Sequence, residues 1–379
     1  PPPPESVPQA ADDATIQAIA QAIRSSSKAA LLLGGKALRE PSLLAAARIA
    51  AHSGVKVFAE VFPTRMERGA GLPSVERIAY LAEMAGVQLA GLEHLILVDA
   101  KSPVSFFAYP GKESDLAPEG CQVHTLASPQ QAAAASLDAL ARALGAHDTQ
   151  PLLHPLRRPG RPRGPLTAPK VCKAVGHLLP ERAILIDEAI TSGLMLGAMT
   201  QGCPRHDLIT LTGGAIGQGL PNAVGAAIAC PDRPVITLIG DGTAMYTIQA
   251  LWSMAREQLH VVNIIFNNAS YSVLNVELER VGAQAGGHKA QSQLSLAGPQ
   301  LNFTQFAIGM GVHAVRTSDS EDFCQALQYA LATPGPHLIE ALVPESLVGA
   351  KRKLLPWLLR SLPHLPPTMA RALKAKIAP

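Results

Sequence analysis

A carboxylate and a pair of side-chain amides follow two successive apolar segments in the second half of the chain. Asp241 lies in a Gly-Asp-Gly triplet (240–242) directly after the apolar segment 235–239, and Asn268 ends an Asn-Asn pair directly after the apolar segment 261–266. A strand-helix-strand crossover returns the chain to the same edge of a sheet, where neighbouring strands lie about 5 Å apart. Asp241 and Asn268 can then reach one cation. A carboxylate, an amide oxygen and a backbone carbonyl form a hard oxygen site that suits Mg²⁺ shared with phosphate oxygens.

Each motif alone also has an ordinary structural interpretation. A Gly-Asp-Gly triplet is a common tight turn, and two asparagines at a strand end form a plausible turn. The two motifs together, with Asn268 placed 27 residues after Asp241, are specific enough to predict the metal site.

The pair of motifs resembles the thiamine diphosphate binding motif, and the wider segment IGDGTAMYTIQALW resembles benzoylformate decarboxylase and the large subunit of acetolactate synthase. The resemblance is strong over 184–343 and looser over 12–147. It implies thiamine diphosphate and Mg²⁺ as cofactors. It also implies that Asp241, Asn268 and the backbone carbonyl of Ser270 hold the Mg²⁺ that anchors the diphosphate.

The resemblance assigns further contacts with the cofactor. Gly242 and Thr243 would contact the diphosphate, as would Thr191 and Ser192 in the segment DEAITSG, and Tyr271 would also lie at the cofactor. The hydroxyls of Thr191 and Ser192 have helix capping as an alternative role.

The glycine-rich segment 213–221 also resembles the family. By itself it could be any turn that leads into a helix, because glycine allows positive φ and a close backbone approach. The resemblance implies that Gly214 offers its carbonyl to the aminopyrimidine and that Ile216 holds the cofactor bent. The cofactor would supply the electron sink, and the protein its shape and electrostatics.

The activity that the resemblance implies is decarboxylation of a 2-oxo acid, followed by protonation or carboligation of the enamine, in a homodimer or homotetramer. The donor and acceptor substrates stay open. The alternative is a non-catalytic nucleotide-binding or regulatory module that retains the fold.

Several positions depart from the family pattern. The activating glutamate comes from a pyrimidine-binding domain that no segment matches, and the proline-rich start 1–11 suggests that this domain is missing, so the catalytic residues stay unknown. Glu60, in an apolar strand, is interpreted as structural or solvent-facing. Ala108 lies where benzoylformate decarboxylase has a catalytic histidine. Glu277 replaces an aromatic pocket residue, either as a polar pocket residue or, as we expect, as a solvent-facing helical glutamate.

Two loops have candidate roles. The long polar segment 281–300 is a candidate active-site lid, on which His288 and Lys289 could steer an anionic 2-oxo acid or could simply be solvated. Gly34-Gly35 lacks the GxGxxG spacing of a dinucleotide or flavin site and is interpreted as a remnant of the fold.

The elements that must position these residues alternate between short apolar strands and helices, which predicts α/β architecture with two doubly wound parallel sheets. The first, Rossmann-like domain covers 12–150, and the thiamine diphosphate-binding domain covers 167–345. Predicted strands of the first domain are 29–33, 55–62, 95–98 and 123–126. Predicted elements of the second are helix 168–179, strand 183–187, a glycine-rich turn into a helix over 213–230, strand 235–239, helix 245–258, strand 261–266, helix 321–332 and strand 337–340.

The composition is that of a folded protein, with 379 residues, 47% hydrophobic and 16% charged. The net charge of +3 comes from the Pro/Arg-rich linker 151–166 and the basic tail 346–379, and the remainder is acidic, which argues against nucleic-acid binding. Five widely spaced cysteines and the lack of a signal-like start favour a reducing, cytoplasmic location. The amphipathic tail predicts packing on a partner subunit or the cofactor site rather than firm membrane association.

Overall fold

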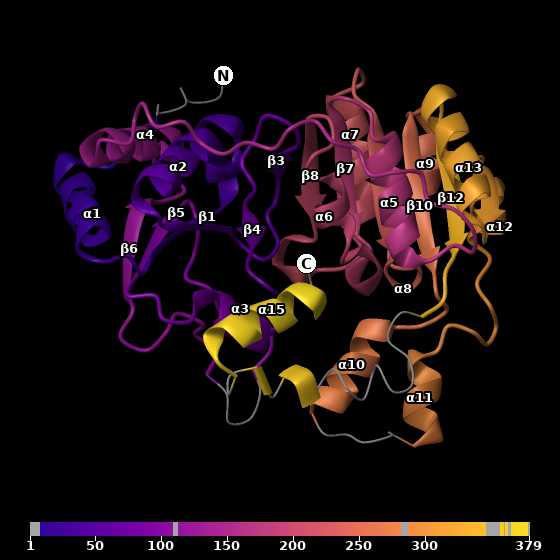
Figure 1. Cartoon of the computed structure of the whole chain (residues 1–379). Helices are drawn as coiled ribbons and strands as arrows, with labels where there is room; N and C mark the ends of the chain where they lie inside the picture. The colour runs from indigo at the N-terminus through magenta and orange to yellow at the C-terminus, as the bar shows by residue number, and fades with distance from the viewer. Residues whose placement is uncertain are drawn as a thin grey trace. The chain divides into compact units, whose positions relative to one another are not determined.

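The computed structural model describes residues 8–108, 113–281, 287–345, 357–359, 361–362 and 365–377. The chain folds into two compact units (Figure 1). The first contains 1–67, 71–154 and 365–372, and the second contains 68–70, 155–364 and 373–379. Each unit has its own parallel sheet, as the alternation of strands and helices predicted.

The first unit is built on a five-stranded sheet in the order β4-β2-β1-β5-β6, with every neighbouring pair parallel. The central strand β1 is buried along its whole length, because both faces of a parallel sheet are covered by helices. The strands are β1 (Ala29–Leu33), β2 (Lys56–Ala59), β4 (Glu76–Arg77), β5 (His94–Val98) and β6 (Gln122–Ala127). The four strands predicted here all form, and the two-residue β4 is the one the sequence did not indicate.

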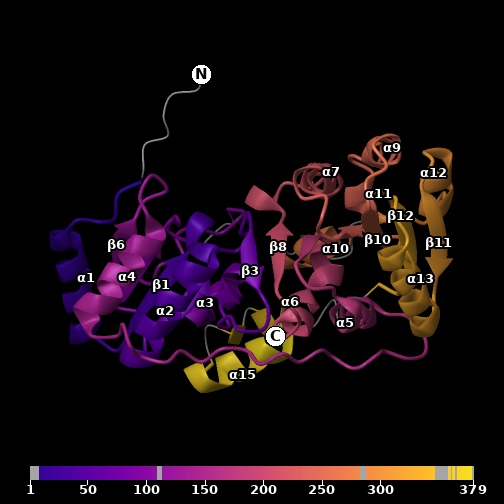
Figure 2. The ribbon, with the colours of Figure 1, turned by 90° about the horizontal axis from the view of Figure 1, so that it is seen from above.

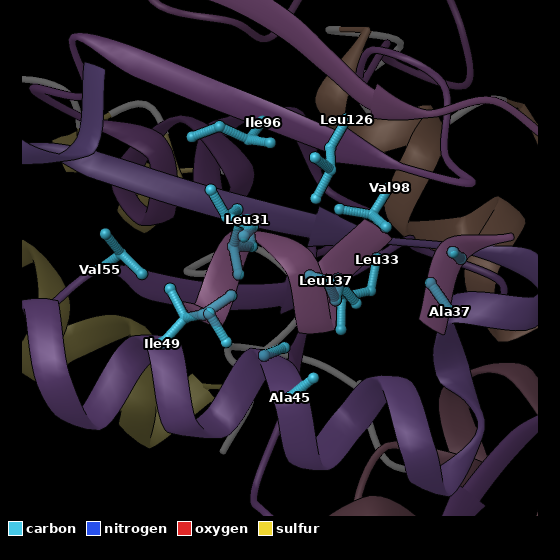
Figure 3. Close-up of a cluster of buried hydrophobic side chains, with 14 of the residues drawn as sticks. Leu31, Leu33, Ala37, Ala45, Ile49, Val55, Ile96, Val98, Leu126 and Leu137 are labelled. Atoms are coloured by element: carbon cyan, nitrogen blue, oxygen red, sulfur yellow. The ribbon is translucent and has the colours of Figure 1, made fainter. Parts of the chain in front are cut away.

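Helices cover both faces of this sheet. The side chains of Leu31, Leu33, Ile96 and Val98 point from the strands toward α2 and α4, where they meet residues such as Ile49 (Figure 3). A smaller apolar cluster lies on the opposite face against α3. The helical elements are α1 (Asp13–Ser25), η1 (Gly35–Leu38), α2 (Glu40–Ser53), α3 (Ala82–Leu89) and α4 (Ala133–Leu144).

The second unit is built on a sheet in the order β11-β12-β10-β9-β7-β8-β3, in which the first six strands pair in parallel. The sequence did not indicate β3, β8 or β11. Strand β11 is half exposed along its length, so it lacks the continuous apolar run that predicts a buried strand. The strands are β3 (Met66–Arg68), β7 (Ala183–Glu188), β8 (His206–Thr210), β9 (Val235–Gly240), β10 (Val261–Asn267), β11 (His313–Thr317) and β12 (His337–Leu342).

Helices α5, α6 and α13 lie on one face of this sheet, and α7, α9 and α12 lie on the other (Figure 2). The elements after β10, α10 and α11, lead away from the sheet (Figure 1). The helical elements are α5 (Ala168–Leu178), η2 (Ile190–Gly193), α6 (Leu196–Thr200), η3 (Thr212–Gly214), α7 (Gly219–Ala229), α8 (Asp241–Ala244), α9 (Ala250–Arg256), α10 (Ser272–Arg280), α11 (His288–Leu294), α12 (Phe303–Gly309) and α13 (Ser320–Ala332).

The glycine-rich turn into a helix predicted over 213–230 is confirmed. Gly213, Gly214 and Gly217 adopt positive φ in η3 and the turn after it, and α7 begins at Gly219. The predicted helix 245–258 is a series of turns followed by α9. The spacing of Met245, Ile248, Trp252 and Ala255 predicts one face packed on the sheet, but Trp252 is 52% exposed and lies under the Arg256 guanidinium.

The proline-rich segment after the first unit is extended and fastened to the second unit. The guanidinium of Arg158 donates to the carbonyl oxygens of His177 and Leu179, at 3.1 and 2.6 Å. The Gly164 N–H donates to the Glu321 carboxylate at 2.8 Å. Side-chain hydrogen bonds thus hold this segment, whose prolines prevent regular pairing in a sheet.

Much of the basic tail lies outside the described residues. Its described part includes α15 (Pro367–Ile377), in which Ala370 is buried. Among the described helices of the chain, none has both the length and the apolar character needed to cross a membrane.

Candidate functional site

The predicted site residues follow the carboxyl ends of four adjacent strands, β8, β7, β9 and β10. Strand β9 pairs with β7 on one side and with β10 on the other. Gly240 is opposite Phe266, so Asp241 and Asn268 each follow the last paired residues of neighbouring strands. The prediction that these two strands are neighbours is confirmed.

The Asp241 carboxylate connects the two strand ends. Its Oδ2 accepts the backbone N–H groups of Asn268 (3.0 Å) and Ala269 (2.7 Å), and its Oδ1 accepts that of Gly242 (2.8 Å). The side chain is only 3% exposed. Burial raises the pKa of Asp241 to about 6, although the three backbone N–H groups act in the opposite direction. Asp241 therefore ties the loop after β10 to the end of β9.

The two asparagines after β10 have different environments. The Asn267 side chain is buried and donates to Glu340 at 2.7 Å, so it belongs to the interior of the sheet. The Asn268 side-chain oxygen lies at the edge and accepts the Ser270 N–H at 3.0 Å. Between them and the helix that follows, Ala269 adopts φ +55°, a left-handed conformation that costs an alanine energy and turns the loop sharply.

The segment predicted as a lid pairs with this loop. Ser270 and Ser295 form an isolated antiparallel bridge, in which the Tyr271 N–H donates to the Leu294 carbonyl and the Leu296 N–H donates to the Ala269 carbonyl, at 3.0 and 2.8 Å. Neither bond uses the Ser270 carbonyl. The prediction of a long polar loop is thus wrong in part. The segment contains α11, and backbone hydrogen bonds hold it against the loop after β10.

Glu345, which sequence reasoning missed, also lies beside this loop. One of its carboxylate oxygens accepts from the hydroxyls of Ser270 and Ser272, each at 3.3 Å. The Asn275 amide donates to the Ser270 hydroxyl at 3.1 Å. Only its place as the last acidic residue of the chain could have drawn attention to it.

The donors at this edge fit a Mg²⁺ ion. Asp241 has accepting capacity beyond its three hydrogen bonds, since a carboxylate carries about four lone-pair positions. Asn268 and Ser270 contribute neutral oxygens from the loop that Asp241 organises. Among the described residues no cluster of three or more His, Cys, Asp or Glu side chains could hold a metal alone. A single carboxylate with neutral oxygens suits Mg²⁺ that completes its octahedron with phosphate oxygens and water.

The predicted diphosphate contacts after β9 are tightly packed. The Tyr271 ring covers Gly242 so closely that a Cβ there would lie 2.2 Å from a ring carbon. The Thr243 hydroxyl donates to the Gly240 carbonyl at 2.9 Å. It is therefore the backbone N–H of Thr243, rather than its side chain, that remains the candidate phosphate donor.

The predicted contacts after β7 lie in η2, which packs against β9. Ser192 is buried, and Thr191 is half-buried. The preceding residue, Ile190, adopts φ +51°, which is rare for a β-branched side chain and is found mainly where the surrounding structure imposes it. Thr191 and Ser192 thus lie beside the strand end that carries Asp241.

The glycine-rich segment follows β8, the neighbour of β7 in the sheet. Gly214 adopts φ +70° and Ile216 is half-buried in the turn before α7. The Thr247 hydroxyl donates to the Gly217 carbonyl at 2.8 Å, which ties the segment to the turns after α8. The fold therefore brings this segment, Thr191, Ser192 and the Asp241 loop to one edge of the sheet.

Glu188, the last residue of β7, is a site residue that the sequence analysis missed. It is 1% exposed, and its two carboxylate oxygens accept the backbone N–H groups of Gly217 and Gly219. Burial raises its pKa. The signal was present, because an acidic residue at the end of an apolar strand is the same pattern that identified Asp241.

Glu277 is not the solvent-facing residue that we expected. It is paired with Arg280, whose guanidinium donates to both carboxylate oxygens at 2.8 and 2.9 Å, and the two side chains are only 16% and 5% exposed. The i, i+3 spacing on α10 allows the pair to form, and the pair offsets the cost of burying each charge.

The other departures are placed as follows. Ala108 is exposed, and the loop beyond it lies outside the described residues. His288 and Lys289 are exposed in the first turn of α11. Glu60 is partly buried and accepts the Gly35 N–H at 3.2 Å, and burial raises its pKa. This contact supports the structural interpretation of Glu60.

The fold is a doubly wound α/β architecture, and its candidate cation site lies at the carboxyl ends of the strands. Residues 194–341 match the family model of the C-terminal TPP-binding domain of thiamine pyrophosphate enzymes. The chain is 53% identical over 332 residues to a Mycobacterium tuberculosis protein named for the acetolactate synthase large subunit, IlvX, a match that covers 87% of this chain and 64% of that protein. It is 31% identical over 275 residues to benzoylformate decarboxylase of Pseudomonas aeruginosa, covering 68% of this chain and 50% of the enzyme.

The solved structures agree in fold. A thiamine diphosphate-dependent 4-hydroxybenzoylformate decarboxylase of Rhodococcus jostii superposes with a TM-score of 0.73 at 24% identity, over 90% of this chain and 66% of that one. The predicted resemblance to thiamine diphosphate-dependent enzymes is thus confirmed. The chain spans about two thirds or less of the length of these proteins.

Proposed function

We propose that this chain holds thiamine diphosphate through Mg²⁺ and takes part in the decarboxylation of a 2-oxo acid, followed by protonation or carboligation. The observation that carries the proposal is the Asp241 carboxylate, which joins the ends of β9 and β10 and presents the Asn268 and Ser270 oxygens beside it. The relatives named for acetolactate synthase and benzoylformate decarboxylase support the substrate class.

Each part of the edge has a role in this proposal. Asp241, Asn268 and the Ser270 carbonyl would hold the Mg²⁺, and backbone N–H groups at the start of α8 would meet the diphosphate. The Gly214 carbonyl would accept from the aminopyrimidine, and Ile216 would pack against the rings. When bound, thiamine diphosphate supplies the electron sink for the carbanion left by loss of CO₂.

The remaining catalytic groups are proposed to come from outside the described residues of this chain or from another subunit. Ala108 has no titratable group, and Glu60 already accepts a backbone hydrogen bond in the first unit. We therefore propose that activity requires a further domain with an activating glutamate, and that the active assembly is a homodimer or homotetramer.

Two measurements test the proposal. Calorimetric titration of the chain with thiamine diphosphate should show binding that requires Mg²⁺. Absence of binding would refute the cofactor assignment. Release of CO₂ from a panel of 2-oxo acids, measured with the chain alone and with a full-length relative as positive control, then tests the substrate class. Binding without turnover by the chain would agree with a missing catalytic group.

A further inference from the structure

The Glu188 carboxylate bonds to two glycine N–H groups of one turn. Its two oxygens are directed to Gly217 and Gly219, so one side chain bridges the end of β7 and the start of α7. A hydrogen bond to a buried charged group contributes more than one between neutral groups. The turn that lies between, with Ile216 at its start, is consequently attached to the rigid centre of the sheet.

The packing around this turn leaves no room for a side chain at Gly217 or Gly219. A Cβ added at Gly219 would lie 2.5 Å from a Glu188 oxygen and 2.5 Å from the Ile239 side chain. A Cβ added at Gly217 would lie 2.7 Å from Tyr246, and this glycine has φ +92°. Both glycines are therefore needed for the close approach of the carboxylate.

The same turn is fastened from its other sides. Thr247 donates to the Gly217 carbonyl at 2.8 Å. The Gln218 side chain donates to the carbonyls of Thr212 and Ala215, at 3.1 and 2.6 Å. Together with the Glu188 carboxylate, these contacts hold the backbone that carries Ile216.

We propose that Glu188 is a positioning residue that sets the placement of Ile216 and Gly214 for the rings of the cofactor, while Asp241 serves the diphosphate. This inference rests on the proposed function. Because each carboxylate is assigned to a different part of the cofactor, the two roles can be tested separately. The affinity of a ligand that has the diphosphate without the rings should depend on Asp241 and not on Glu188. The affinity of a ligand with both parts should depend on both residues.

The experiment compares thiamine diphosphate with inorganic diphosphate, each titrated calorimetrically with Mg²⁺ into the full chain. In Glu188→Gln the side-chain NH₂ would face an N–H donor, so one of the two bonds is lost. We expect affinity for thiamine diphosphate to fall about tenfold, and affinity for diphosphate to change less than about twofold. An unchanged preference for thiamine diphosphate over diphosphate would overturn the inference.

A pair of glycine variants supplies a matched control within α7. Gly219→Ala places a methyl group against Glu188, whereas Gly225→Ala adds one to open space on the same helix. Gly219→Ala should repeat the selective loss, and Gly225→Ala should leave both affinities as in the wild type. Equal effects of the two variants would contradict the inference, because they would indicate a general effect on the helix.

Hydrogen exchange of the ligand-free chain distinguishes a local effect of each variant from a general loss of stability. Hydrogen exchange of the Gly217 and Gly219 amides should be slow in the wild type and faster in Glu188→Gln, with the amides of β10 unchanged. Uniform acceleration would instead mean global destabilisation and would count against the inference. If the wild type binds diphosphate but gains no affinity from the rings, the inference fails while the Mg²⁺ site stands. If it binds neither ligand, the proposed function fails as well.

Discussion

The two sheets end in similar turns, but the acidic side chains at their carboxyl edges have different effects. In the first unit the turn after β1 is closed by the protein itself. Glu60 accepts the Gly35 N–H at 3.2 Å, and Asp99 accepts the Lys36 N–H at 2.6 Å. These N–H groups follow the first strand, where a phosphate binds in nucleotide-binding sheets. Two carboxylates now occupy that place, and their charge disfavours an anion.

In the second unit the carboxylates connect loops instead of closing one turn. Asp241 joins the loop after β10 to the end of β9, and Glu188 joins the glycine-rich turn to the end of β7. The Asn268 side-chain oxygen and the Ser270 carbonyl, the neutral oxygens proposed for a cation, belong to the loop that Asp241 holds. The comparison shows that a doubly wound sheet provides the position for a site, and the side chains at its edge decide whether one exists.

The largest expected effect comes from Asp241. Asp241→Ala should weaken Mg²⁺-dependent thiamine diphosphate binding at least about 100-fold, because it removes a metal ligand and the acceptor for three backbone N–H groups. Asp99→Ala, the equivalent change in the first unit, should leave binding intact. Calorimetry checks both. Asp241→Asn, which keeps the shape of the side chain, should also lose binding, and retained affinity there would remove Asp241 from the metal site.

The pH dependence of binding tests the same carboxylate. Asp241 has a pKa of about 6 in the folded chain, against 3.8 as its ordinary value. Mg²⁺ requires the ionised form, so affinity should fall about tenfold for each pH unit below about 6 and be level above it. Calorimetry across this range measures the effect, and level affinity down to about pH 5 would contradict it.

The stability of the ligand-free chain should change with pH in the opposite direction. Because the folded pKa of Asp241 is raised, its stabilisation of the fold is complete below about pH 3.8 and is lost as pH rises through about 6. The loss amounts to about 3 kcal/mol in the free energy of unfolding. Glu188 and Glu60 are shifted in the same direction by burial. Denaturant unfolding of Asp241→Asn, compared with the wild type at several pH values, isolates the contribution of Asp241.

A methyl group at Gly35 should disrupt the turn after β1 in the first unit. Gly35→Ala would place a Cβ 2.4 Å from the Asp99 carboxylate at φ +41°, so the bond to Lys36 must give way. We expect a loss of about 2 kcal/mol in the free energy of unfolding and no loss of thiamine diphosphate affinity. Gly86→Ala, in open space on α3, is the control and should be neutral or slightly stabilising. Weakened cofactor binding in Gly35→Ala alone would show that the first unit contributes to the site.

The smallest effect concerns the loop after β10. Ala269→Gly should raise the free energy of unfolding by about 0.5–1 kcal/mol, because glycine adopts φ +55° without strain. Thermal unfolding of the ligand-free chain measures it. A decrease would mean that the methyl group contributes more by packing than it costs in conformation.

The strands that carry the site could be predicted because they are short, apolar and buried on both faces. Residues 235–239 and 261–266 were expected as strands, and β9 and β10 extend each of them by one residue. Strands with exposed positions, such as β11, were missed because periodicity alone does not distinguish them from loops. The helix expected at 245–258 begins only at Ala250, and Thr247 in the turns before it donates its hydroxyl to Gly217, a tertiary contact that no local pattern indicates.

Within the site, the motif was sufficient to find Asp241 and Asn268 but not their environment. Glu188 was overlooked because its partners lie 29 and 31 residues further along the chain. Glu277 was misassigned because helical spacing does not reveal whether the face it occupies is buried.

The sequence by itself determined the two α/β domains, the strand ends that carry polar residues and the resemblance to thiamine diphosphate-dependent enzymes, because all three depend on residue type at short spacing. Only the tertiary structure decided that Glu188 faces Gly217 and Gly219, that Leu294 and Leu296 pair with the loop after β10, and that Glu60 and Asp99 close the first turn. Those contacts depend on which strands become neighbours, and long-range packing sets that order rather than any local pattern.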